Sequence, residues 1–185
     1  MNLLVETPPD YIIVRGKKLK INTSFGLWVE LIISSKKDDK KKAENAINKI
    51  LCEKTDGTFE EVITECLKWL SVNNETEKTC NTSKETTSTS VPFDFEIDGN
   101  IIYCELWEYF PHLMERGISY HEGIELIKII MHNENSILWH RAFARCGDFS
   151  KMDKDHKQYW QKQRAMYIIS NMDDQSIDDV FARAF

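Results

Sequence analysis

The first regular pattern along the chain is a pair of short runs, one apolar and one of lysines with Leu19 and Ile21. The runs cover residues 11–14 and 17–21, and the dipeptide Arg15-Gly16 joins them. β-Branched residues on both sides of a two-residue connection that contains glycine are typical of a β-hairpin. We therefore expect a short antiparallel hairpin near the start of the sequence.

A helical pattern follows the hairpin. Residues 24–34 are apolar on nearly every side of a helix, so we expect this segment in the core. Asn22 or Thr23 precedes it and has the side chain of a helix N-cap. The charged run 36–42 carries both signs, and we interpret it as a solvated loop and not as a phosphate site.

Two further amphipathic helices are predicted before residue 72. The first has apolar positions at spacings i, i+3, i+4, i+7 and i+8 and is expected to end near Asp56-Gly57. The second begins with the capping box of Thr58 and Glu61. Their apolar faces are Ala43, Ala46, Ile47, Ile50 and Leu51 in the first, and Phe59, Val62, Ile63, Cys66, Leu67 and Leu70 in the second.

A polar stretch then divides the sequence. Residues 73–90 are mostly Asn, Glu, Thr, Lys and Ser and include no large apolar side chain. Such a segment cannot bury enough surface to offset its ordering entropy. The predicted organisation is therefore a hairpin plus helices over 1–72, a flexible polar linker over 73–91, and a helical part over 92–185.

The part after the linker shows only helical periodicity. Pro111 is expected to end the first of its helices, and Ser119 with Glu122 forms a second capping box. Neither Gly nor Pro occurs after Gly147. The expected helices cover 99–110, a segment after 119 with Ile124, Ile127, Ile130 and Met131 on one face, 135–145, 155–170, and a terminal helix after Ser176.

These elements predict a mainly α protein, a multi-helix domain with a short N-terminal β-hairpin. Composition agrees, because 7 Gly and 4 Pro in 185 residues are about half the usual share. The hydrophobic fraction of 42% permits a sizeable core, and a net charge of −6 disfavours nucleic acid and anionic membrane surfaces as partners. No segment is long enough to span a membrane, and the first residues do not resemble a signal peptide.

The cysteines do not indicate a disulfide framework. Their number is odd and no Cys-x-x-Cys pair occurs, so reduced thiols in a cytosolic compartment are the simplest interpretation. Cys104 and Cys146 lie within or beside apolar runs, and we expect them to be small buried hydrophobes. The five are Cys52, Cys66, Cys80, Cys104 and Cys146.

No catalytic or cofactor motif is complete. His121-Glu122 begins like the His-Glu-x-x-His zinc motif, but Glu125 stands where the second histidine would be. Capping by Ser119 and Glu122 explains this segment better. Phosphate-binding glycine loops and the Gly-x-Ser-x-Gly elbow are missing from the sequence. We therefore expect no enzyme activity, no catalytic residue, no cofactor and no metal.

Aromatic residues are concentrated in the helices after the linker. The simplest interpretation places them in the core, and the alternative is that a minority is exposed and forms a groove for a partner helix. The sequence leaves both open. The candidate partner-binding residues are Trp107, Tyr109, Phe110, Trp139, Phe143 and Trp160.

Several segments resemble, in their order, one family of phage proteins. They are Pro9 to Gly16-Lys17, Ile21-Asn22-Thr23-Ser24-Phe25 with Trp28, Phe93-Asp94-Phe95-Glu96-Ile97-Asp98 with Ile102-Tyr103, and Leu138-Trp139-His140-Arg141-Ala142-Phe143. The family is that of the tail assembly chaperones of tailed phages and prophages, encoded just upstream of the tape measure protein. Ser24 replaces the family's usual Asp, and Gly26 its usual Arg.

The resemblance implies a non-enzymatic protein of the host bacterial cytoplasm. Such a protein binds the tape measure protein and other tail proteins during tail morphogenesis and needs no cofactor, and self-association is left open. The alternative is a structural tail or connector component that stays in the virion. A third, more distant hypothesis is a metal-dependent enzyme that uses His121, Glu122 and Glu125.

Overall fold

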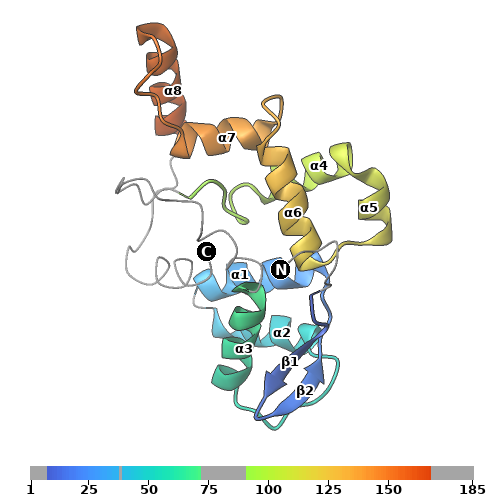
Figure 1. Cartoon of the computed structure of the whole chain (residues 1–185). Coiled ribbons are helices and arrows are strands. Elements are labelled where there is room, and N and C mark those ends of the chain that lie inside the picture. The colour runs from blue at the N-terminus through green and yellow to red at the C-terminus, as the bar shows by residue number, and fades with distance from the viewer. Residues whose placement is uncertain (1–7, 38, 72–90, 168–185) are drawn as a thin grey trace. The chain divides into compact units, whose positions relative to one another are not determined.

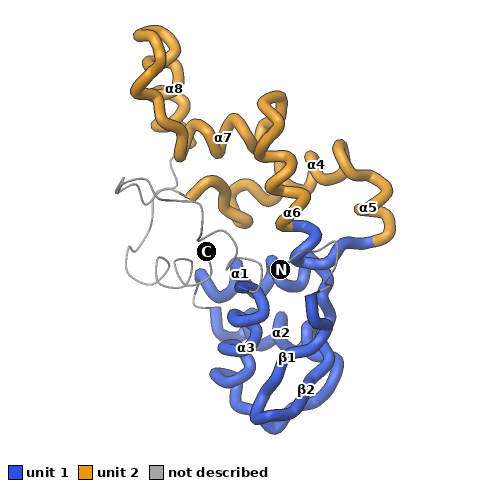
Figure 2. Tube along the Cα trace, in the orientation of Figure 1, with its two compact units in different colours: residues 1–84, 117–123, 175–185 blue, residues 85–116, 124–174 orange. Residues whose placement is uncertain are grey.

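The structure, a computed structural model, describes residues 8–37, 39–71 and 91–167. These residues form eight α-helices and a two-stranded sheet (Figure 1). The predicted fold class, mainly α with an N-terminal β-hairpin, is thereby confirmed. The described residues fall into two compact units (Figure 2), with 8–71 and 117–123 in unit 1 and 91–116 and 124–167 in unit 2.

The hairpin of unit 1 forms as predicted. Its strands are antiparallel, with Tyr11 opposite Lys20 and Val14 opposite Lys17. Arg15 and Gly16 between them have φ angles of 50° and 77°, the left-handed conformation that a tight two-residue hairpin turn requires. The elements of unit 1 are β1 (Tyr11–Val14), β2 (Lys17–Lys20), α1 (Phe25–Lys36), α2 (Lys40–Ile50) and α3 (Phe59–Ser71).

The core of unit 1 centres on stacked tryptophans. Trp28 of α1 is fully buried and stacks on Trp69 of α3 with ring centroids 4.1 Å apart. Tyr120 lies against both rings, at 6.3 and 6.2 Å. Tyr120 belongs to segment 117–123, which pairs with the chain ahead of α1 through a bridge between Ser24 and Ser119. This segment therefore adds to the core of unit 1 although it lies far along the sequence.

Two helix boundaries in unit 1 differ from the prediction. Ser24, and not Asn22 or Thr23, is the N-cap position of α1, while the Asn22 side chain accepts a hydrogen bond from the Ser24 backbone N–H. The charged run 36–42 is helical at Lys36, where α1 ends, and from Lys40 onward, where α2 begins behind the N-cap Asp39. The mixed charge of the run does not by itself indicate where these two helices end and begin.

Helix α2 also ends earlier than Asp56-Gly57. Its last residue is Ile50, and Leu51 is extended and bridges Ile21. The Ile50 carbonyl accepts from the Asn22 N–H at 2.7 Å, and the Lys20 carbonyl accepts from the Cys52 N–H at 3.0 Å. Pairing with the end of the hairpin therefore removes the backbone groups that a longer helix would use.

Both predicted capping boxes are confirmed. The Thr58 N–H donates to Glu61 Oε2 at 2.8 Å, and the Glu61 N–H donates to Thr58 Oγ1 at 3.3 Å. The Ser119 N–H donates to Glu122 Oε2 at 2.9 Å, and the Glu122 N–H donates to Ser119 Oγ at 3.3 Å. Each box satisfies backbone donors that the first helical turn leaves open.

Unit 2 consists of helices. Pro111 does not only end the first of them but also begins the next, where its missing N–H costs nothing. Buried residues of unit 2 include Ile102, Leu106, Ile127, Ile130 and Leu138. The helices are α4 (Gly99–Tyr109), α5 (Pro111–Arg116), α6 (Tyr120–Met131, whose residues 120–123 belong to unit 1), α7 (Ile137–Cys146) and α8 (Lys154–Tyr167).

The prediction for two cysteines is wrong. Cys104 and Cys146 are exposed, whereas Cys66 on α3 is buried, and burial raises the pKa of its thiol to about 12. Each of the two exposed cysteines lies on the outer face of a helix whose opposite face is buried.

Some predictions concern residues outside the described part of the chain. The predicted linker 73–91 lies there except for Val91, and so do Cys80 and the predicted terminal helix after Ser176. Among the described helices, none combines the length and apolarity that a membrane crossing demands.

Candidate partner-binding surface

Helix α4 has one buried face and one exposed face. Ile102, Glu105 and Leu106 are buried, as their spacing of three and four residues predicts for one side of a helix. On the other side Tyr103 is 58% exposed and Trp107 37% exposed. The helix therefore presents aromatic rings to solvent while its opposite side is fixed in unit 2.

A buried ion pair fixes the start of α4. The Asp98 carboxylate is fully buried and accepts hydrogen bonds from Arg145 at 2.6 and 3.0 Å and from Arg141 at 2.8 Å. It also accepts from the Asp94 N–H at 2.9 Å. Burial would raise the pKa of Asp98, but the hydrogen bonds from Arg145, Asp94 and Arg141 outweigh burial and hold this pKa below its usual range. Asp98 is therefore ionised and ties α4 to α7.

A second buried carboxylate joins the middle of α4 to the start of α7. Glu105 accepts from the Ser136 hydroxyl at 3.0 Å and from the Ile137 N–H at 2.6 Å. The Leu138 N–H also points to this carboxylate, at 3.3 Å. A negative charge at a helix N-terminus is stabilised by the open N–H groups and the helix dipole. Asp98 and Glu105 together make α4 a rigid platform.

The exposed side of this platform is called the α4 aromatic face. We define it by Tyr103 and Trp107, with Cys104 and Glu108 beside them on the same side of the helix. The Tyr103 and Trp107 rings meet edge to face with centroids 6.4 Å apart. Sequence reasoning included Trp107 but missed Tyr103. The signal that identifies Tyr103 is its spacing of four residues from Trp107, which places both rings on one side of a helix.

Tyr109 is the last residue of α4, and Phe110 is its C-cap. Tyr109 is 37% exposed and Phe110 is half-buried, and their ring centroids are 6.4 Å apart. Three of the six candidate aromatics, Trp107, Tyr109 and Phe110, thus lie within one short stretch. Two of the three are exposed.

The other three candidates pack together between α7 and α8. Trp139 and Phe143 stack with centroids 4.9 Å apart, and Trp160 meets Phe143 edge-on at 4.8 Å. Trp160 is buried, and Trp139 and Phe143 are partly buried against the same cluster with Phe149. The structure therefore does not bring these three rings to the α4 aromatic face, and their burial favours a packing role.

The segment that begins like a zinc motif, His121-Glu122, has a structural role. His121 is buried, with its ring 4.3 Å from that of Trp69. Burial lowers the pKa of His121 to about 4, although a hydrogen bond to the Trp69 backbone opposes this effect. Glu122 serves the capping box, and Glu125 pairs with Lys128 at 3.1 Å. Over the described parts of the chain, no group of three His, Cys, Asp or Glu side chains has the arrangement of a metal site.

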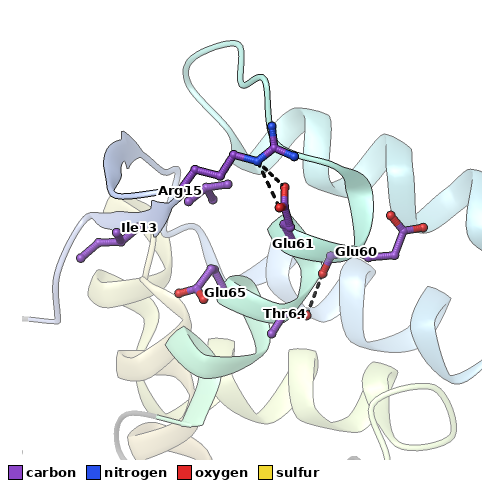
Figure 3. A pocket seen from close by; sticks show the side chains of 7 residues that line it. Ile13, Arg15, Glu60, Glu61, Thr64 and Glu65 are labelled. Atoms are coloured by element: carbon purple, nitrogen blue, oxygen red, sulfur yellow. Dashed lines mark hydrogen bonds and ion pairs between the residues drawn. The ribbon is translucent and has the colours of Figure 1, made fainter.

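Unit 1 has a shallow hollow of about 460 Å³ between β1 and α3 (Figure 3). Three of its seven lining residues are acidic, Glu60, Glu61 and Glu65, and Arg15 forms an ion pair with Glu61 at 2.8 Å. Glu65 in turn pairs with Lys68. Glu60 lies 3.9 Å from the Lys40 ammonium group. Because each of the three carboxylates has a cationic partner within the molecule, the hollow is a weak candidate for a ligand site. The α4 aromatic face is the stronger candidate.

Comparisons with known proteins add nothing to this choice. No family model, no curated protein and no solved structure matches the chain.

Proposed function

We propose that this chain is a non-enzymatic tail assembly chaperone of a tailed phage or prophage. It binds a tape measure protein in the host bacterial cytoplasm while the tail is built, and tail proteins later displace it. No cofactor and no chemical turnover are involved. The ordered segments that resemble this family over most of the chain are one support for the proposal.

The observation that carries the proposal is the α4 aromatic face. Tyr103 and Trp107 expose large rings on a helix that Asp98 and Glu105 fix from behind. Tyrosine and tryptophan are enriched where protein partners bind, because each buries much area and loses little side-chain entropy. A rigid support reduces the ordering cost of binding further. This combination suits a surface that covers another polypeptide.

The physics of tail assembly fits such a surface. A tape measure protein is a very long helical rod, and an unassembled rod with apolar stripes would aggregate through them. A helical binder with exposed aromatic rings covers such stripes reversibly. The net charge of −6 would keep the coated complex soluble.

Co-expression with the tape measure protein tests the proposal. The expected result is that the tape measure protein stays soluble and co-purifies with this chain, and that it precipitates when expressed alone. A tape measure protein that stays equally dispersed without this chain would contradict the proposal, as would a reaction that the chain accelerates.

A second measurement separates a chaperone from a structural tail component. Mass spectrometry of purified mature particles should find this chain absent or far below the amount of a tail subunit. Stoichiometric amounts in mature tails would instead favour the structural alternative, in which the same exposed rings form a permanent interface.

A further inference from the structure

We propose that the α4 aromatic face binds an α-helix of the partner, and that lysine or arginine residues flank the apolar stripe of that helix. The identification of the partner as a tape measure protein rests on the proposed function. The shape of the bound segment rests on the geometry of α4, and its charge rests on the acidic residues of α4 and of the stretch around it.

The shape of the face points to a helix as its occupant. Tyr103 and Trp107 are four residues apart and form a ridge in which the rings meet edge to face, with centroids 6.4 Å apart. Such i, i+4 ridges pack into the grooves between the side chains of another helix. A β-strand would need an open backbone edge for its hydrogen bonds, and the backbone groups of a helix are already paired.

The charge of the face points to basic flanks. The stretch from Val91 to Pro111 contains no lysine or arginine, while it contains five acidic residues. Glu96 and Glu108 are exposed, and the other three, Asp94, Asp98 and Glu105, are buried. Basic residues beside a partner's apolar stripe would meet Glu108 at the rim of the contact. Charges at the rim mainly set specificity and the rate of association.

Other occupants fit less well. Nucleic acid and anionic lipid would be repelled by the same glutamates. A second copy that used the same face in a two-fold dimer would bring like charges together at Glu108. Residues 168–185 of this chain contain four aspartates and one arginine, so their charge also opposes binding here.

Synthetic helical peptides test the inference directly. One peptide has a leucine stripe flanked by lysines, a second has the same stripe flanked by glutamates, and a third keeps the lysines without the stripe. The full chain should bind the first peptide measurably more tightly, by at least about 10-fold, than either of the others. Binding of the first peptide should weaken as salt is raised, because salt screens the charges at the rim.

Matched variants locate the binding surface. Tyr103→Ser with Trp107→Ser should weaken binding of the first peptide by at least about 10-fold, and Glu108→Lys should weaken it and reduce its salt dependence. Tyr159→Ser and Glu134→Lys are controls in unit 2, since both residues are exposed and lie outside α4. Both controls should bind as the wild type does. Circular dichroism melts check that every variant is folded.

Three results would overturn the inference. They are equal binding of the lysine-flanked and glutamate-flanked peptides, undiminished binding by folded α4 variants, and self-association of the wild type that the α4 substitutions abolish. Its failure is distinguishable from failure of the proposed function. If α4 variants still retain the tape measure protein, only the inference fails; if the peptide binds and the tape measure protein does not, only the proposed function fails.

Discussion

Arg145 donates hydrogen bonds from both terminal nitrogens to the carboxylate of Asp98, with Nη1 at 2.6 Å from Oδ2 and Nη2 at 3.0 Å from Oδ1. Both side chains are buried, and the residues are 47 positions apart in the sequence. The guanidinium also donates to the backbone carbonyls of Pro92 and Tyr167. One side chain thus connects the approach to α4, the body of α7 and the end of α8.

Removal of this arginine should destabilise unit 2 strongly. Arg145→Met leaves the buried charge of Asp98 with Arg141 as its remaining cation, which predicts a loss of about 3–5 kcal/mol in the free energy of unfolding. Urea denaturation followed by circular dichroism measures the loss. Lys151→Met, at an exposed lysine of the same unit, should change stability by less than about 0.5 kcal/mol. A loss below about 1 kcal/mol for Arg145→Met, which is close to the error of extrapolated unfolding free energies, would contradict this prediction.

Neutralising Glu105 tests the cap that it forms on α7. Glu105→Gln keeps the size of the side chain but removes the charge that faces Ser136 and the Ile137 N–H. We expect a loss of about 1–2 kcal/mol in denaturant unfolding, since hydrogen bonds to charged groups are the stronger kind. Glu125→Gln, which removes only a partly exposed pair with Lys128, should cost less than about 1 kcal/mol. Equal losses for the two substitutions would show that the Glu105 cap contributes no more stability than the partly exposed ion pair of Glu125.

The tryptophans should differ sharply in their contribution to stability. Trp28 is fully buried, stacks on Trp69 and donates from Nε1 to the Asn22 carbonyl at 2.8 Å. Trp28→Ala should therefore lower the free energy of unfolding by about 3–5 kcal/mol. Trp107→Ala on the α4 aromatic face should lower it by less than about 1 kcal/mol. Thermal or urea melts that show similar losses for both variants would contradict the assignment of Trp107 to an exposed face.

His121 should make the fold sensitive to acid. Well above pH 6.5 the imidazole is neutral in both states, and between pH 6.5 and about 4 the unfolded chain binds a proton that the folded chain largely does not. Stability therefore falls as the pH is lowered through this window, and the shift from 6.5 to about 4 corresponds to a loss of about 3 kcal/mol. Urea midpoints at a series of pH values measure this slope.

Variants isolate the histidine from the carboxylates that also titrate in acid. His121→Gln should flatten the slope between pH 6.5 and 4, even if it lowers stability at neutral pH. His132→Gln, at an exposed histidine, should leave the slope as in the wild type. A slope that survives in His121→Gln would mean that other groups dominate acid unfolding.

The sequence predicted only part of the candidate partner-binding surface. The aromatic residues after the linker all have similar neighbours in the sequence, so local pattern did not separate Trp107 from Trp139 and Trp160. The structure separates them, since Trp139 and Trp160 meet across two helices at 6.1 Å, while Trp107 faces solvent. The spacing of four residues between Tyr103 and Trp107 is present in the sequence and is the local signal that indicates the aromatic face.

What followed from the sequence depends on contacts within a few residues. Such features are the turn at Arg15-Gly16, the capping boxes of Thr58 and Ser119, and the periodic apolar faces. They could be predicted because the residues that form them are only a few positions apart in the sequence. Only the tertiary structure decided the end of α2 at Ile50, the exposure of Cys104, and the pairing of Asp98 with Arg145. These depend on which distant segments pack together, and that choice is made by the whole core and not by neighbouring residues.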